Sequence, residues 1–281
     1  MIAAGSIECI AGIVLAAGKG SRMLGFEGNK TLLPLLPGPS PYSGNRPMLL
    51  EVLDNLPEGP KGIVVHHFAD AVRAATEHLN VIYLQQPVTN GTGGAVLTAR
   101  PFLETVSCDR VIITMGDVPL IRPTTYESLL KGLVGNHLMV LAFEPADRAQ
   151  YGMLETRGDQ VERITEWKYW REYPEERRSR LRWCNAGVYA ARRLSLCQYL
   201  ERLAKHPHHV QKQRGDQWVT VEEFFLTDLV ELLGSDGLGV GFAVAAEEEV
   251  MGVDTPETLD RAQAIYALRR QGASPGVKPD A

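Results

Sequence analysis

Short apolar runs alternate with segments of helical periodicity along the first half of the chain. Continuous apolar runs of strand length occupy residues 10–17, 62–66, 81–84, 111–115 and 138–143. Between them, apolar side chains recur at helical spacing over residues 48–56, 69–79, 91–104 and 124–133. Strands that are buried on both faces have such uninterrupted apolar sequences, and helices connect them across the sheet. The pattern therefore predicts an α/β fold with a central, mostly parallel mixed sheet covered on both faces.

The second half of the chain changes to shorter, antiparallel-looking pieces. Two strands, 152–156 and 161–167, flank the turn residues 157–159, and they predict a hairpin that lies over the ligand cleft. A strand at 185–191 follows, and helices are expected over 195–204, over 221–233 and from Pro256 onward. We expect this half to add a small antiparallel layer to the central sheet.

Three polar stretches are less regular. The Pro, Gly and Ser residues of 37–47 predict a surface loop. Residues 168–183 are dense in charged and aromatic side chains, and they form either a solvated, partly helical connection or a cover over bound substrate. The histidines His206, His208 and His209 match no zinc-binding spacing, so we expect a surface loop there as well.

A glycine-rich loop follows the first apolar run. Residues 18–22 read Gly-Lys-Gly-Ser-Arg and supply two glycines, a hydroxyl and two cations. Free backbone N–H groups beside fixed positive charge suit a polyphosphate ligand. Two better-known phosphate loops are excluded, because Gly12 lies one residue too early for a Walker A loop and Met23 stands where a dinucleotide-binding loop needs its third glycine. A tight turn without a ligand is the alternative.

Composition and charge limit the possible partners. The net charge of −5 offers no basic surface for nucleic acid, so an anionic substrate must meet local cations. The apolar N-terminal segment lacks the basic region of a signal peptide, so we expect it to be the first strand. No other segment approaches a membrane span. We therefore expect no nucleic-acid or membrane partner and a cytoplasmic location. The four cysteines form no paired motif, which favours free thiols in a reducing compartment.

Eight segments, in order along the chain, resemble the sugar-1-phosphate nucleotidyltransferases. The glycine loop reads LAAGKGSRM and is followed by Lys30 in NKTLLPL. The other matching segments, which extend to about residue 260, are QQPVTNGTGGAV, GDVPLI, YGMLE, ITEWK, NAGVYAA, EFFLTDLV and VMGVDTPETL. Within this family the chain is most similar to the uridyltransferase domain of N-acetylglucosamine-1-phosphate uridyltransferases. The resemblance implies a Rossmann-like nucleotidyltransferase fold in which the antiparallel layer binds a sugar.

The resemblance implies a reaction in which a sugar-1-phosphate oxygen attacks the α-phosphorus of a nucleoside triphosphate and pyrophosphate leaves. A phosphate monoester has a second pKa of about 6, so this nucleophile is largely ionised at neutral pH and needs no general base. Arg22 and Lys30 match the family residues that neutralise the phosphates. The expected substrates are UTP and N-acetylglucosamine-1-phosphate, with Mg²⁺ as the cofactor.

The resemblance also implies the remaining site residues. Asp117 and Asp254 match the Mg²⁺ ligands, although from the residues alone Asp117 is equally a turn residue and Asp254 equally the N-cap of the last helix. The residues expected to bind the nucleotide are Ala16, Ala17, Gly18, Gly20, Gln86, Gly91 and Thr92. Those expected to bind the sugar are Gly152, Glu166 and Asn185. The chain departs from the family pattern at Asn29, Thr89, Tyr169 and Asp254.

We expect one nucleotidyltransferase domain over residues 1–271. Within it, residues 8–145 are expected to bind the nucleotide, 146–255 the sugar, and 256–271 to form a closing helix, with a flexible tail at 272–281. No hexapeptide-like repeat follows residue 230, so we expect no β-helix acetyltransferase domain. The sequence gives no oligomeric state. Two alternatives are another pair of nucleoside triphosphate and sugar phosphate, and a catalytically inactive module that binds nucleotide sugars.

Overall fold

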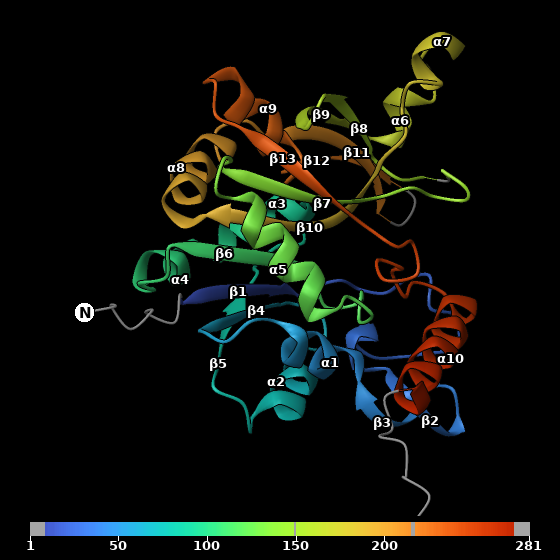
Figure 1. Cartoon of the computed structure of the whole chain (residues 1–281). Helices are drawn as coiled ribbons and strands as arrows, with labels where there is room; N and C mark the ends of the chain where they lie inside the picture. The colour runs from blue at the N-terminus through green and yellow to red at the C-terminus, as the bar shows by residue number, and fades with distance from the viewer. Residues whose placement is uncertain (1–8, 149, 215–216, 273–281) are drawn as a thin grey trace, which may run out of the picture.

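A nine-stranded mixed sheet forms the centre of the molecule in the computed structural model, which describes residues 9–148, 150–214 and 217–272 (Figure 1). The strands lie in the order β5 (Val81–Gln85), β4 (Lys61–Val65), β1 (Ile10–Leu15), β6 (Arg110–Met115), β10 (Cys184–Arg192), β7 (Leu138–Phe143), β13 (Val240–Ala245), β9 (Gln160–Thr165) and β8 (Met153–Arg157). The first four strands are parallel, and β10 runs antiparallel between β6 and β7. The predicted hairpin of β8 and β9 is continuous with this sheet through β13.

Helices cover both faces because successive strand residues point to opposite sides of a sheet. In β1, Ile13 belongs to one buried core and Val14 to the other. The face of Ile13 is covered by α3 (Gly91–Thr98), α4 (Arg100–Thr105), α8 (Arg193–Leu203) and α9 (Asp228–Ser235). The face of Val14 is covered by α1 (Met48–Asn55), α2 (Ala69–Thr76) and α5 (Pro123–Gly132). The apolar pattern of the sequence therefore predicted both the strands and their two-sided burial.

A third, smaller core joins the last helix to the first part of the chain. Helix α10 (Pro256–Gly272) packs on the hairpin of β2 (Pro34–Ser40) and β3 (Ser43–Pro47) (Figure 1). The side-chain amide of Gln263 donates to the backbone oxygens of Pro34 and Pro41, each at 2.8 Å. The start of this helix at Pro256 is as predicted, and it continues to Gly272. The rest of the expected tail lies outside the described residues.

Four predicted elements need correction. The surface loop expected at residues 37–47 is the β2–β3 hairpin. The single helix expected over 91–104 is divided at Ala99, because Pro101 cannot donate a backbone hydrogen bond within a helix. The histidine loop and the start of the helix expected at 221–233 form a second hairpin, β11 (His208–Arg214) with β12 (Gln217–Glu223). Helix α9 begins only at Asp228.

The connection at residues 168–183 is partly helical, as one of its two interpretations predicted. It contains α6 (Trp167–Trp170) and α7 (Glu175–Arg178), and α7 has no buried residue. Trp170 anchors the connection, since its side chain is buried and its Nε1 donates to the backbone oxygen of Tyr151 at 2.8 Å.

The prediction of four free thiols is wrong for one pair. Cys9 and Cys108 form a disulfide, with their Cα atoms 4.9 Å apart. These residues meet because β1 and β6 are parallel neighbours, with Ile10 opposite Arg110. Cys184 and Cys197 are free. Among the described helices, none combines the length and the apolar composition that spanning a bilayer requires.

Ile13 provides a test of the two-sided sheet, because its side chain is fully buried between β4 and β6. We expect Ile13→Ala to lower the free energy of unfolding by about 3 kcal/mol, since it removes buried methyl groups and leaves a cavity. Ile82→Ala on the edge strand β5, where the side chain is 49% exposed, is the matched control and should cost well under half as much. Urea unfolding followed by circular dichroism measures both losses. Equal losses would contradict this placement of β1.

Candidate active site

A pocket of about 390 Å³ lies at the carboxyl ends of the parallel strands β1, β5 and β6. Open α/β sheets bind their ligands at this edge. Every residue predicted to act on the phosphates, the nucleotide or the metal lines this pocket: Ala16, Ala17, Gly18, Gly20, Arg22, Lys30, Gln86, Gly91, Thr92, Asp117 and Asp254. Segments that are more than 230 residues apart in the sequence therefore meet at one site.

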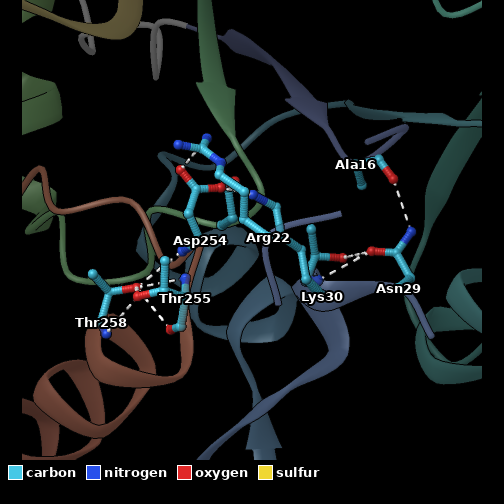
Figure 2. A network of polar contacts seen from close by, with 9 residues as sticks. Ala16, Arg22, Asn29, Lys30, Asp254, Thr255 and Thr258 are labelled. Atoms are coloured by element: carbon cyan, nitrogen blue, oxygen red, sulfur yellow. Dashed lines mark hydrogen bonds and ion pairs between the residues drawn. The ribbon is translucent and has the colours of Figure 1, made fainter. Parts of the chain in front are cut away.

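Four charged side chains form a chain of ion pairs across the pocket. The Lys30 ammonium pairs with Oδ2 of Asp117 and with Oδ1 of Asp254. Arg22 Nη2 donates to the other Asp254 oxygen at 2.8 Å, and Figure 2 shows both cations directed at this carboxylate. Lys30 and Asp117 are each 9% exposed, whereas the Arg22 side chain is 70% exposed. The site thus has a buried cation between two carboxylates and a second cation at its mouth.

The Lys30 ammonium is stabilised in its charged form. Burial by itself lowers the pKa of this lysine, because it removes the charge from water. The nearby Asp117 and Asp254 carboxylates outweigh that effect, so the pKa is raised above the ordinary lysine value. Lys30 is therefore a fixed positive charge at neutral pH.

Backbone hydrogen bonds hold the two aspartates side by side. Gly116 N donates to the Leu15 oxygen at 3.0 Å, which fixes the segment after β6 beside the end of β1. Val253 N donates to the Asp117 oxygen at 2.9 Å, so the segment before α10 lies against Asp117. Asp117 follows Gly116 directly, and Asp254 follows Val253. These bonds therefore place the two carboxylates that pair with Lys30.

The structure also decides which residue caps α10. Thr255 Oγ1 accepts a hydrogen bond from Thr258 N at 3.3 Å, which is the bond that an N-cap side chain makes to the third helical residue. The Asp254 carboxylate points instead toward Lys30 and Arg22, as Figure 2 shows. Asp254 is therefore not the N-cap, and its carboxylate belongs to the pocket.

Asn29 positions Lys30, a role that the sequence did not reveal. Its side chain is 1% exposed and caps the short 3-10 helix η1 (Lys30–Leu32). Its Oδ1 accepts from Thr31 N at 3.1 Å and from Thr31 Oγ1 at 2.8 Å. Its Nδ2 donates to the backbone oxygens of Ala16 at 2.9 Å and His67 at 3.0 Å, and the bond to Ala16 is visible in Figure 2. Asn29 thus ties the turn that carries Lys30 to the ends of β1 and β4.

The three predicted sugar residues lie together, outside the residues that line the pocket. Asn185 N donates to the Gly152 oxygen at 2.8 Å, and a Cβ built on Gly152 would lie 3.5 Å from a Glu166 carboxylate oxygen. The Asn185 side chain already has two partners, since it accepts from Gly187 N at 3.0 Å and donates to the Tyr189 hydroxyl at 2.8 Å. The Glu166 carboxylate has fewer protein partners than the Asn185 amide, with one hydrogen bond of 3.4 Å from Thr227.

The turn after Asn185 borders the pocket. Gly187 has a φ of +73°, which favours glycine, and a Cβ there would lie 3.7 Å from the Met115 side chain. Met115 itself lines the pocket. The turn that follows Asn185 therefore lies against a residue of the pocket wall.

Two further lining residues, Lys212 and Glu223, were missed by the sequence analysis. They belong to the β11–β12 hairpin, whose residues were predicted to form a loop and the start of a helix. The alternation of Val219 and Val221 with polar neighbours was the available signal for a strand.

The two aspartates are the residues that could hold a metal ion. Within residues 9–148, 150–214 and 217–272, no group of three or more His, Cys, Asp or Glu side chains is arranged to bind a metal. Mg²⁺ does not need such a cage, because it is usually held by one or two carboxylates, several waters and substrate phosphates. The pair of Asp117 and Asp254 fits this requirement.

A family model, the MobA-like NTP transferase domain, matches residues 12–217. This range includes the glycine loop, Lys30 and Asp117. The chain belongs to this family. It is a nucleotidyltransferase, as the motifs indicated.

Similar proteins agree with this assignment. Among curated relatives, this NTP transferase domain is 34% identical over 262 residues to the bifunctional protein GlmU of Ruegeria pomeroyi, covering 92% of the chain and 52% of the relative. It is 35% identical over 271 residues to the GlmU protein of Sphingopyxis alaskensis, covering 94% of the chain and 54% of the relative. The chain spans about half the length of these relatives.

A solved structure confirms the fold. The uridine diphosphate N-acetylglucosamine pyrophosphorylase of Trypanosoma brucei superposes with a TM-score of 0.69 at 14% identity, covering 96% of this chain and 69% of that one. At this identity the likeness concerns the fold alone. It supports the mixed α/β architecture of the NTP transferase domain.

Asn29 offers a test of how the domain holds Lys30. Asn29→Ala leaves the buried Ala16 oxygen and the partly buried His67 oxygen without their shared donor, and we expect the free energy of unfolding to fall by about 1 to 3 kcal/mol. Asn80→Ala, at an exposed asparagine, is the matched control and should change stability by less than about 0.5 kcal/mol. Urea unfolding measures both. A loss at Asn29 no larger than the control's would show that these bonds do not position η1.

Glu166 gives a prediction about pH. Burial raises the pKa of its carboxyl group above the ordinary value, and the Thr227 hydroxyl opposes this only in part. Between the ordinary pKa of about 4.3 and the raised one, the folded protein keeps a proton that the unfolded chain has released, so this carboxyl lowers stability as the pH rises. Glu166→Gln removes the titration, and its stability relative to wild type should increase as the pH rises above the ordinary pKa of about 4.3 and become constant above the raised one. A pH-independent difference in urea unfolding would contradict the buried placement.

Proposed function

We propose that this domain transfers a nucleotidyl group from UTP to N-acetylglucosamine-1-phosphate, forming a nucleotide sugar and pyrophosphate. The observation that carries the proposal is the buried Lys30 ammonium held between Asp117 and Asp254, beside the glycine loop and the exposed Arg22. Nucleotidyl transfer brings two anions together, so it depends on positioning and on charge neutralisation. This pocket concentrates both kinds of charge at one strand edge.

The cations have distinct tasks in this proposal. Arg22 lies at the mouth, where its forked guanidinium can donate to oxygens of the triphosphate. Lys30 is nearly buried and acts as a point charge near the transferred phosphate. In the free protein, Arg22 and Lys30 donate to Asp254. When the substrates bind, these two cations donate to phosphate oxygens instead. The sugar phosphate is already ionised, so no side chain has to remove its proton.

Asp117 and Asp254 are the residues that would hold Mg²⁺. Their carboxylates both pair with a cation, the Lys30 ammonium, and this placement of two carboxylates around one positive charge supports the proposal. A bound Mg²⁺ supplies charge neutralisation of the phosphate oxygens there. The two carboxylates would be its protein ligands, and Lys30 and Arg22 would be left to bind the phosphates.

The nucleotide would follow the strand edge from the glycine loop to the start of α3. Gly20 has a φ of +66° and Gly91 a φ of +93°, so both turns are shaped by glycine and bring the backbone close to the pocket. Thr92 lies in the first turn of α3 and lines the pocket, so its hydroxyl can donate to an oxygen of the ligand. Gln86 is 3% exposed and donates one amide N–H to Asn90, so its second N–H and its side-chain oxygen are left for base recognition.

The sugar would lie beside Met115, against the group of Gly152, Glu166 and Asn185. Glu166 is the proposed acceptor for sugar hydroxyls, because a buried carboxylate gains from donors that the protein does not supply. The choice of N-acetylglucosamine rests on the resemblance of the YGMLE, ITEWK and NAGVYAA segments. We place the reaction in the cytoplasm, since both substrates carry charged phosphates that do not enter a bilayer unaided.

Pyrophosphate release tests this proposal. Protein with Mg²⁺ is assayed with UTP, CTP, dTTP, ATP and GTP, each paired with a panel of hexose-1-phosphates that includes N-acetylglucosamine-1-phosphate. We expect turnover with UTP and N-acetylglucosamine-1-phosphate, and a loss of about a hundredfold or more in Lys30→Met and Asp117→Asn, because each removes charge that acts on the transition state.

Lys131→Met is the matched control for charge removal, since Lys131 lies on the surface of α5 with its side chain 78% exposed. It should retain wild-type turnover. Release only with another substrate pair would overturn the choice of UTP or of the sugar. No release from any pair, with nucleotide binding retained, would make the domain a non-catalytic nucleotide-binding module.

A further inference from the structure

The β11–β12 hairpin presents one of its two faces to the nucleotide pocket. Lys212 lies opposite Val219, and His208 lies opposite Glu223. Because side chains two residues apart share a face of a strand, Lys212 and Glu223 lie on the same side of the hairpin. Both line the pocket, whereas Trp218 on the opposite face is 68% exposed. The hairpin therefore contributes a wall to the site as well as a solvated surface.

The base of the hairpin is fixed against the start of α3. Phe224 N donates to the Asn90 oxygen, and Gly93 N donates to the Phe224 oxygen, each at 2.9 Å. The approach is so close that a Cβ on Gly91 would lie 2.5 Å from the Phe224 oxygen. Gly91 and Thr92 are the proposed nucleotide residues of this turn. Glu223, directly before Phe224, is thus held at the nucleotide end of the pocket.

The other strand is anchored by His208. Its Nε2 lies 2.7 Å from an Asp228 carboxylate oxygen, and its ring stacks on Phe225 with the ring centres 4.4 Å apart. Asp228 is the first residue of α9, which packs in the core beneath the sheet. Both strands of the hairpin are therefore fixed to the body of the domain at the end that carries His208 and Glu223, and Lys212 lies four residues further along β11, toward the turn.

Lys212 is the charged donor on this wall. Its ammonium pairs with Oε1 of Glu223, whose side chain is 12% exposed, while the Lys212 side chain is 44% exposed. An ammonium carries three donors and no acceptor, and a nucleotide offers oxygens on its phosphates, ribose and base. A partly exposed ammonium with one carboxylate partner has donors left for such oxygens.

We propose that Lys212 is a further nucleotide-binding residue, delivered by the β11–β12 hairpin and held at the pocket wall by Glu223. This assignment rests on the proposed function, because it needs a nucleoside triphosphate in the pocket. Lys212 acts on the nucleotide and not on the sugar phosphate, since the hairpin abuts Gly91 and Thr92, and the sugar group of Glu166 and Asn185 lies outside the residues that line this pocket.

Binding of UTP in the presence of Mg²⁺, measured by isothermal titration calorimetry, tests the assignment without requiring turnover. We expect Lys212→Met to weaken UTP binding about tenfold, as the loss of a charge-assisted hydrogen bond does. Lys212→Arg keeps the charge and should stay within about threefold of wild type. Lys131→Met, the surface control, should bind like wild type.

Steady-state kinetics separate nucleotide binding from a structural role. In Lys212→Met, the KM for UTP should rise about tenfold while the KM for the sugar phosphate and the melting temperature stay at wild-type values. Unchanged UTP binding, or equal increases in both KM values, would overturn the role of Lys212 and leave the proposed function standing. Wild-type protein that binds no nucleoside triphosphate would overturn the proposed function, and the assignment of Lys212 with it.

Discussion

The ion pairs of Lys30 with Asp117 and Asp254 are the interaction on which the arrangement of this domain depends. A nearly buried ammonium is costly unless opposite charges and hydrogen bonds compensate for its lost hydration. Here the compensation comes from two segments distant in sequence, the end of β6 and the approach to α10. The fold must therefore bring the last helix back to the first strands. The packing of α10 on the β2–β3 hairpin and the bond from Val253 N to the Asp117 oxygen do so.

The same constraint explains why the site suits phosphate chemistry. The positions of Lys30 and Asp254 are set by neighbours that do not themselves reach the ligand, namely Asn29 below Lys30 and Thr255 at the start of α10. Because these neighbours fix the backbone, the charged groups themselves are free to exchange partners. In the free protein they neutralise one another, and in the proposed complex the cations turn to phosphate oxygens. A site organised in this way needs little rearrangement of the backbone to bind two anions.

Local sequence patterns predicted much of the fold and of the site. The strands β1, β4, β6 and β7 were predictable because buried parallel strands are uninterrupted apolar runs, and α10 because Pro256 marks a helix start. The residues that line the pocket were predicted through the family resemblance, whose motifs are short and keep their order along the chain. The position of the pocket at one edge of the sheet followed as well, because the carboxyl ends of parallel strands all lie at the same edge.

Features that depend on distant partners were not predictable. Asn29 matters because it reaches the oxygens of Ala16 and His67, which no local pattern relates to it. The Cys9–Cys108 pair depends on β1 and β6 being neighbours, although 99 residues separate the two cysteines. The β11–β12 hairpin has only a weak apolar alternation, so its two strands resembled a polar loop and a helix start. Lys212 was missed for that reason.

We propose that Asp117 and Asp254 form a cation site that works together with a bound nucleotide. Electron paramagnetic resonance of Mn²⁺, a spectroscopic substitute for Mg²⁺, tests it directly by measuring the free ion in the presence of UTP and protein. Wild-type protein should lower the free Mn²⁺ signal well below the level reached with UTP alone, and the Asp117→Ala, Asp254→Ala double variant should lose this additional binding. A double variant that takes up Mn²⁺ and UTP as strongly as wild type would contradict the account.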